Sequence, residues 1–222
     1  MPNKNKYDET IYFKASGNEP FWGLEITEEN FRFTSLSEGF EAFNAPHTEP
    51  IWAMDANVKM YRSMPELGEM KIQIAQQSCT DDMSGKENKY QVTVELKRSI
   101  DKKFKGCGNY ITDYRLHDIW SLEEMNGKPI DVPQYGKERP RIEINSSQNT
   151  FMGSAGSHEI SGKIIFEKGL LRFTDIAVPL NLTAAENGFI KNLQSATGYK
   201  LENNRLVLFN PAGELLKLKK TD

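Results

Sequence analysis

The chain has 222 residues, with 28 Lys and Arg against 31 Asp and Glu and a net charge of −3. This length exceeds that of an ordinary single domain and suits two domains of about 110 residues each. No block of one charge sign occurs, which argues against nucleic acid or an anionic membrane as the main partner, because both need a concentrated basic face. No apolar run approaches the roughly 18 residues of a membrane span.

The first ten residues are polar and contain neither an apolar signal core nor a small-residue cleavage site. We interpret residues 1–10 as a polar leader or linker, of the kind that remains when a signal peptide or lipid anchor is removed. The localisation expected on this interpretation is extracytoplasmic.

The chain has two cysteines, Cys79 and Cys107, both in polar, loop-like surroundings. An even count with such flanks suits a disulfide in an oxidising compartment, and a pair of free thiols is the alternative. A bond would close a loop of 28 positions, for which chain entropy predicts about 3 to 4 kcal/mol of stabilisation.

The first half has the pattern of short strands and turns. Residues 22, 24 and 26 alternate as apolar positions after a turn cluster at 17–20, and residues 90–97 show the clearest alternation in the chain. Further strands are predicted at 11–15, 31–33, 51–54, 58–61 and 70–74. Short strands at this spacing predict an antiparallel barrel or sandwich.

The pattern restarts at Leu116, so we place a domain boundary near residue 113. Strands are predicted at 141–144, 150–153, 162–166, 170–173, 199–201, 205–209 and 215–218. Between them lies one helix, from about 184 to 196. Thr183 and Glu186 have the spacing of a capping box, and Gly198 is placed to end the helix in a left-handed conformation.

The apolar stripe of this helix comprises Ala185, Phe189, Ile190, Leu193 and Ala196, which predicts packing against a sheet. The fold class predicted for the chain is mainly β (α+β): two small antiparallel barrel- or sandwich-like domains, the second with one packed helix. The domains are expected at 11–113, which contains the cysteine pair, and at 114–222.

The second half resembles the META domain of heat-inducible bacterial envelope proteins and lipoproteins. The matching segments are Leu116-x-x-x-Trp120-x-Leu122, residues 125–127, 139–144, 151–153, 169–173 and 206–208, with the predicted helix in family order. The chain departs from the family at 156–162, where Gly156-Ser157-His158 replaces a common Gly-Cys-Asn. A thiol role for that motif therefore does not carry over.

The first half resembles a small companion domain of bacterial envelope proteins, of unknown function and often predicted to be membrane-anchored. The resemblance rests on residues 15–22, 79–85 and 106–108. Together the two resemblances imply an extracytoplasmic, lipid-anchored two-domain protein with no established catalytic activity.

Residue patterns typical of catalysis or metal binding are weak. The three histidines, His47, His117 and His158, lack a metal-binding spacing, and no phosphate-cradling loop or serine elbow occurs. Cys79, Asp81 and Asp82 with Cys107 are a weak metal pattern compared with a disulfide beside an acidic turn. Ser157-His158-Glu159 is not expected to form a triad, because successive strand residues face opposite ways, and we interpret it as an exposed loop or edge strand. We predict no enzyme activity, cofactor or metal.

The candidate binding residues are Glu19, Phe21, Trp22, Asp81 and Asp82. An aromatic pair after a tight turn can anchor a partner, although plugging the open end of a small barrel is the alternative.

The predicted function is a non-enzymatic binding or interaction module in envelope stress or maintenance. We expect a monomer whose partner is a protein or small ligand of the envelope. The alternatives are an inhibitor of a hydrolase, indicated by a protruding rigid loop near Cys79 or Gly156, and an apolar-ligand carrier, indicated by an enclosed apolar cavity.

Overall fold

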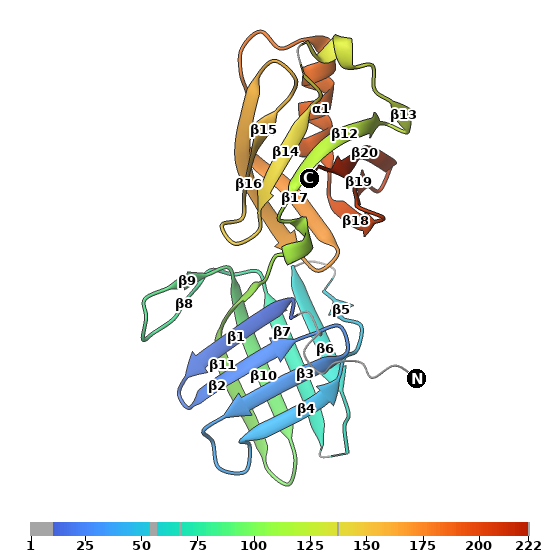
Figure 1. The fold of residues 1–222 in the computed structure, drawn as a ribbon. Helices are drawn as coiled ribbons and strands as arrows, with labels where there is room; N and C mark the ends of the chain where they lie inside the picture. Colours follow the sequence, from blue (N-terminus) through green and yellow to red (C-terminus); the bar gives the residue numbers. More distant parts are fainter. Residues whose placement is uncertain (1–10, 54–56, 67, 137, 222) are drawn as a thin grey trace. The chain divides into compact units, whose positions relative to one another are not determined.

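A computed structural model describes residues 11–53, 57–66, 68–136 and 138–221 (Figure 1). The chain divides into two units, residues 1–111 and 112–222. Strands make up 56% of the structure and helical residues 9%, which confirms the predicted fold class. The predicted leader at 1–10 and the end of the predicted strand 51–54 lie outside the described residues.

The first unit contains one large antiparallel sheet and one small hairpin. The sheet has nine strands in the order β4-β3-β2-β1-β11-β10-β7-β6-β5, and β8 pairs only with β9. The bounds are β1 (Phe13–Asn18), β2 (Phe21–Ile26), β3 (Asn30–Ser35), β4 (Ala42–Pro46), β5 (Ile51–Trp52), β6 (Val58–Ser63), β7 (Glu69–Ala75), β8 (Cys79–Thr80), β9 (Glu87–Asn88), β10 (Tyr90–Lys97) and β11 (Asp101–Tyr110).

Aromatic side chains fill the concave face of this sheet. Phe33 and Phe104 pack with ring centroids 4.8 Å apart, and the indole of Trp22 stacks on Phe33. The Trp22 Nε1 group donates a hydrogen bond of 3.1 Å to the carbonyl of Lys105, which satisfies the buried indole and ties β2 to β11. Alternate residues of β10, predicted to share one face, are all buried.

Several elements of the first unit differ from expectation. The alternation pattern did not predict strands β4, β8, β9 and β11. Strand β1 continues through Gly17 and Asn18, where a turn was predicted. Cys107 lies on the long strand β11 and is only 6% exposed, so the prediction that it occupies a loop is wrong. Its polar neighbours face outward from a strand, a pattern that resembles a loop in sequence.

The second unit is a closed ring of antiparallel strands. The order is β12-β14-β15-β16-β17-β18-β19-β20, with β20 pairing back to β12 and β13 lying beside β12. The bounds are η1 (Tyr114–Leu116), β12 (Ile119–Met125), β13 (Lys128–Pro129), η2 (Val132–Tyr135), β14 (Arg141–Asn145), β15 (Thr150–Ser154), β16 (Glu159–Glu167), β17 (Leu170–Ala177), α1 (Ala184–Ser195), β18 (Gly198–Glu202), β19 (Arg205–Asn210) and β20 (Gly213–Lys220), where η1 and η2 are 3₁₀ helices.

Helix α1 connects β17 to β18. The pairing between these two strands is the shortest in the ring, since they pair only through Leu170 and Gly198. The helix contacts β17 and β20, and Phe189 and Leu193 are fully buried, which confirms the predicted packing face. None of the helices in the described part of the chain is long and apolar enough to cross a membrane.

The predicted left-handed cap at Gly198 is wrong. The helix ends at Ser195, its C-cap residue Ala196 has extended backbone, and Gly198 is the first residue of β18. A Cβ atom at Gly198 would lie 2.5 Å from the ring of Phe209, so this position needs glycine because an aromatic ring occupies the space of a side chain.

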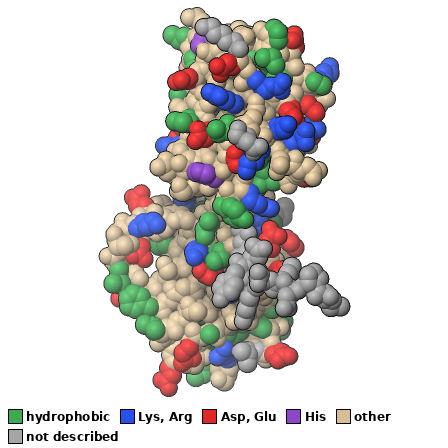
Figure 2. Space-filling view, in the orientation of Figure 1, with side chains coloured by type: hydrophobic (Ala, Val, Ile, Leu, Met, Phe, Trp, Pro, Cys, Tyr) green, Lys and Arg blue, Asp and Glu red, His purple; other side chains and the backbone are tan. Residues whose placement is uncertain are grey.

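On the face drawn in Figure 2, acidic and basic side chains are interspersed. Ion pairs join neighbouring strands of the first unit, such as Lys14 with Glu25 at 2.8 Å and Lys103 with Glu95 at 2.8 Å. This distribution fits the even spread of charge along the sequence.

Candidate binding surface

A disulfide joins Cys79 to Cys107, with the two Cα atoms 5.5 Å apart. The predicted bond is therefore confirmed. It connects the first strand of the β8–β9 hairpin to β11, the neighbour of β1 and β10 in the large sheet. The hairpin projects away from that sheet (Figure 1).

The turn of this hairpin is organised by Asp81. Its Oδ1 atom accepts hydrogen bonds from the backbone amides of Met83 (3.2 Å) and Ser84 (2.8 Å) and from the Ser84 hydroxyl (2.7 Å). These hydrogen bonds, first among them that from the Ser84 amide, lower the pKa of Asp81 and keep it ionised. Backbone bonds from Asp81 to Lys86 and from Gly85 to Asp81 close the turn. Met83 is 67% exposed on it.

Side-chain amides tie the hairpin to the sheet a second time. Asn18 donates to Asp81 Oδ2 at 3.3 Å, and Asn109 donates to Asn88 at 2.7 Å while accepting from the Lys89 amide at 2.8 Å. Both ends of the hairpin are therefore attached to β1 or β11, and these contacts restrain the turn. Such pre-organisation lowers the entropy lost when a partner binds.

An open cleft of about 390 Å³ lies beside the disulfide. The lining residues come from the β1–β2 turn, the hairpin and β11, and they are Ser16, Gly17, Asn18, Glu19, Thr80, Asp81, Asp82, Lys103, Lys105, Gly106 and Cys107. The structure thus places Glu19, Asp81 and Asp82, three of the predicted binding residues, around one cleft. This volume falls within the range of ligand pockets.

Two glycines keep the strands under this cleft in close contact. A Cβ atom at Gly17 would lie 2.2 Å from the Trp22 indole nitrogen, and one at Gly106 would lie 2.0 Å from the carbonyl of Ser16. Any larger residue at either position would separate β1 from β11 or displace the indole. The floor of the cleft is therefore fixed by the core below it.

The two aromatic candidates are separated by the alternation of β2. Phe21 is 47% exposed, whereas Trp22 is 4% exposed and belongs to the core. Trp22 is therefore closed to a surface ligand, and the structure does not support it as a binding residue.

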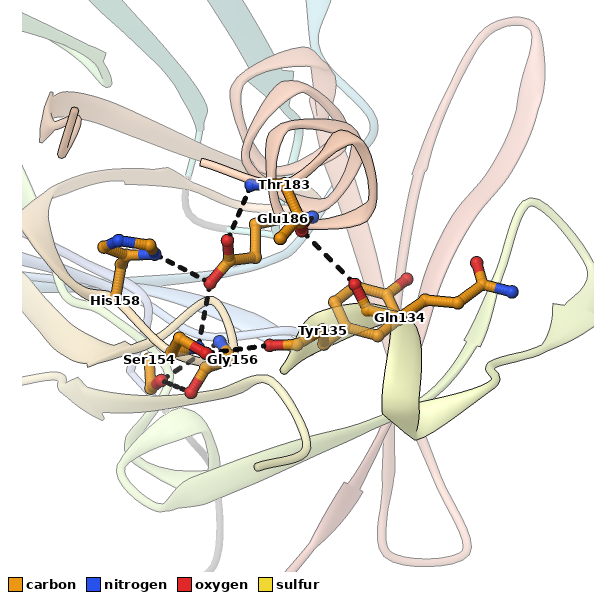
Figure 3. Close-up of polar contacts among 8 residues, drawn as sticks. Gln134, Tyr135, Ser154, Gly156, His158, Thr183 and Glu186 are labelled. Atoms are coloured by element: carbon orange, nitrogen blue, oxygen red, sulfur yellow. Dashed lines mark hydrogen bonds and ion pairs between the residues drawn. The ribbon is translucent and has the colours of Figure 1, made fainter. Parts of the chain in front are cut away.

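The second unit contains a different polar cluster, centred on Glu186 (Figure 3). This carboxylate is fully buried. One oxygen accepts hydrogen bonds from the Ser157 amide at 2.8 Å and lies 3.0 Å from His158 Nδ1, while the other accepts from the Thr183 amide at 2.8 Å. The Thr183 hydroxyl accepts in turn from the Glu186 amide at 3.1 Å, so the predicted capping box is confirmed.

Burial alone would raise the pKa of Glu186, but hydrogen bonds from the Thr183 amide, His158 and the Ser157 amide outweigh it and lower the pKa to about 2. The carboxylate joins the helix start to the loop between β15 and β16. Ser157 Oγ also lies 3.4 Å from the Tyr135 carbonyl of η2, so three segments meet here.

The segment Ser157-His158-Glu159 is a loop that leads into β16, as expected, with Ser157 and Glu159 exposed and His158 half-buried. Ser157 and His158 both contact Glu186, whereas Glu159 begins β16 and is exposed. Sequence reasoning missed this contact, because 28 positions separate His158 from Glu186. The capping box was the only local signal that a carboxylate matters here.

The other histidines lie in separate surroundings. His47 bonds the hydroxyl of Tyr12 in the first unit, and His117 accepts from the Ser146 amide in the second. Among the described residues, no group of three His, Cys, Asp or Glu side chains is arranged to hold a metal ion.

Comparison with known proteins found no match among curated proteins. Two solved structures resemble part of the chain. One, titled an NMR structure, is 23% identical with a TM-score of 0.38 and covers 47% of this chain and 90% of its own. The other is a crystal structure of a DUF4847 family protein from Bacteroides vulgatus, 17% identical with a TM-score of 0.39, covering 48% of this chain and 96% of its own.

The family model of the META domain matches residues 115–222. These residues coincide with the ring of strands and its helix, from the η1 turn onward. The second unit of this chain is therefore identified as a META domain.

Proposed function

We propose that this chain is a non-enzymatic binding module of the bacterial cell envelope, and that the first unit carries its recognition surface. The observation that carries the proposal is the pre-organised hairpin: a disulfide and two asparagine side chains fix its ends, and Asp81 fixes its turn. Rigid exposed turns bind partners with little loss of entropy.

The disulfide supports an extracytoplasmic location, because such bonds persist in oxidising compartments. The resemblance of the second unit to META domains of envelope proteins supports the same location. Glu186 itself is not a candidate general acid or base, because its carboxylate is fully buried and engaged by donors of its own chain. A general acid or base needs access to substrate.

Affinity capture with the full chain tests this proposal. Wild-type protein and the variants Met83→Ser and Met152→Ser would be compared for proteins enriched from an envelope extract. Met152 is a matched control, because it is 60% exposed on β15 of the second unit. We expect a partner that is enriched by wild type and Met152→Ser and lost with Met83→Ser. A partner retained equally by Met83→Ser would place recognition elsewhere and contradict the proposal.

Inhibition of a hydrolase is the second candidate, and the projecting hairpin near Cys79 favours it. An inhibitor loop must fit an enzyme cleft without unfolding, and the hydrogen bonds of Asp81 supply such rigidity. If the captured partner is a hydrolase, its activity should fall with added wild-type chain and recover when Met83→Ser replaces it.

A further inference from the structure

The cleft beside the disulfide contains charged side chains without partners in the protein. Glu19, Asp82 and Lys105 line it, and within the described residues their side chains make no hydrogen bond or ion pair. Nearby charges behave differently: Lys14 pairs with Glu25, and Lys103 pairs with Glu95. Three charges left free around one concave site are available to a ligand.

The other charged groups of the cleft are already engaged. Asp81 accepts from Asn18 and from its own turn, and Lys103 donates to Glu95 at 2.8 Å. The groups open to a ligand are therefore two carboxylates and one ammonium group. The carboxylates lie on the β1–β2 turn and the hairpin, and the ammonium group lies on β11.

This combination discriminates among ligand classes. A simple anion would meet two carboxylates, and a metal ion would meet the Lys105 ammonium group. A ligand that carries both an amine and a carboxylate can satisfy both signs of charge at once. The cleft volume of about 390 Å³ suits a molecule of a few residues rather than a folded partner.

We propose that this cleft binds a small zwitterionic ligand, such as a short peptide with a free amino group and a free carboxylate. The amino group contacts Glu19 and Asp82, and the carboxylate contacts Lys105. The assignment rests on the proposed binding function and names the ligand class for the cleft at the base of the hairpin.

Nuclear magnetic resonance titration of the oxidised full chain tests this inference. Trialanine is the probe, compared with its N-acetylated, C-amidated and doubly blocked forms. We expect saturable shifts at Gly17, Thr80 and Gly106 with trialanine at millimolar concentrations, weaker binding with either single block, and none with both blocks. Shifts of equal size with the doubly blocked peptide, or no saturable shift with trialanine, would overturn the proposal.

Variants assign the two ends of the ligand. Asp82→Asn should weaken trialanine binding about threefold to fivefold but leave the affinity of the N-acetylated peptide, which lacks the amino group, nearly unchanged. Lys105→Gln should weaken trialanine binding by a similar factor but leave the affinity of the C-amidated peptide, which lacks the carboxylate, nearly unchanged. Glu143→Gln and Lys128→Gln, exposed residues of the second unit, are matched controls and should change nothing. Equal losses for cleft and control variants would also overturn the assignment.

Failure of this titration is distinguishable from failure of the proposed function. The capture experiment depends on Met83, which does not line the cleft. If Met83→Ser loses the captured partner and trialanine does not bind, the proposed ligand class is refuted and the proposed function stands.

Discussion

In the first unit a covalent bond and an aspartate hold the turn at 81–86, whereas in the second unit a buried glutamate holds the loop at 155–158. Cys79 and Cys107 attach the hairpin to β11, and Glu186 attaches the loop to the start of α1. Both devices fix a surface segment to the framework. They differ in what breaks them: a reductant breaks the first, and acid weakens the second.

The difference follows from the surroundings of each segment. The hairpin strands have two residues each and bury none of their side chains fully, so little apolar burial holds them. The loop at 155–158 contains the fully buried Ala155 and meets the start of α1, where the carboxylate of Glu186 is shielded from water. Hydrogen bonds to a shielded charge are strong, whereas exposed ones are weak.

The largest expected effect concerns the core that shields Glu186. Phe189→Ala should lower the free energy of unfolding of the second unit by about 3 to 5 kcal/mol, because it removes a fully buried ring and leaves a cavity. Lys191→Ala, on the exposed side of α1, should change it by less than about 0.5 kcal/mol. Chemical denaturation measures both. Equal small effects would mean that the helix face does not pack on the ring.

Removal of the disulfide should have the next largest effect. The double variant Cys79→Ser, Cys107→Ser should destabilise the first unit by about 3 to 4 kcal/mol, because its unfolded chain loses a cross-link between residues 28 positions apart. Denaturation of oxidised wild type and of the variant would measure this. An equal loss in the second unit would contradict the view that each unit relies on its own device.

Acid should act on the second unit by way of Glu186. Its pKa is about 2 in the fold against an ordinary 4.5, so its contribution of about 3 kcal/mol is complete above pH 4.5. The contribution should fall progressively as the pH drops from 4.5 towards 2. Glu186→Gln should remove most of this dependence when unfolding is measured across that range. A variant with the wild-type pH profile would show that other carboxylates are responsible.

The sequence was most informative where regular burial creates a pattern. Alternation along β10 and the stripe of α1 predicted the correct faces, and the polar flanks of Cys79 pointed correctly to a disulfide, although Cys107 lies on a strand. The META resemblance of the second half was also confirmed.

The elements that were missed depend on contacts between distant residues. The β8–β9 hairpin is held by a disulfide, Asp81 and asparagines, none of which leaves an alternating pattern. The hydrogen-bonding contacts of Glu186 with Ser157 and His158 join residues almost 30 positions apart in the sequence. Glu19 and Asp82 were candidates from local motifs, but only the fold brings Lys105 into the same cleft.

Amide hydrogen exchange in the full chain is the most direct test of the central claim that the disulfide pre-organises the hairpin for recognition. The amides of Met83, Ser84 and Gly85, which donate within the turn, would be compared between oxidised wild type and the double serine variant. We predict slow exchange in wild type, faster exchange in the variant, and unchanged protection of the Ser157 amide that Glu186 binds. Equal rates at the three hairpin amides in both proteins would contradict the account.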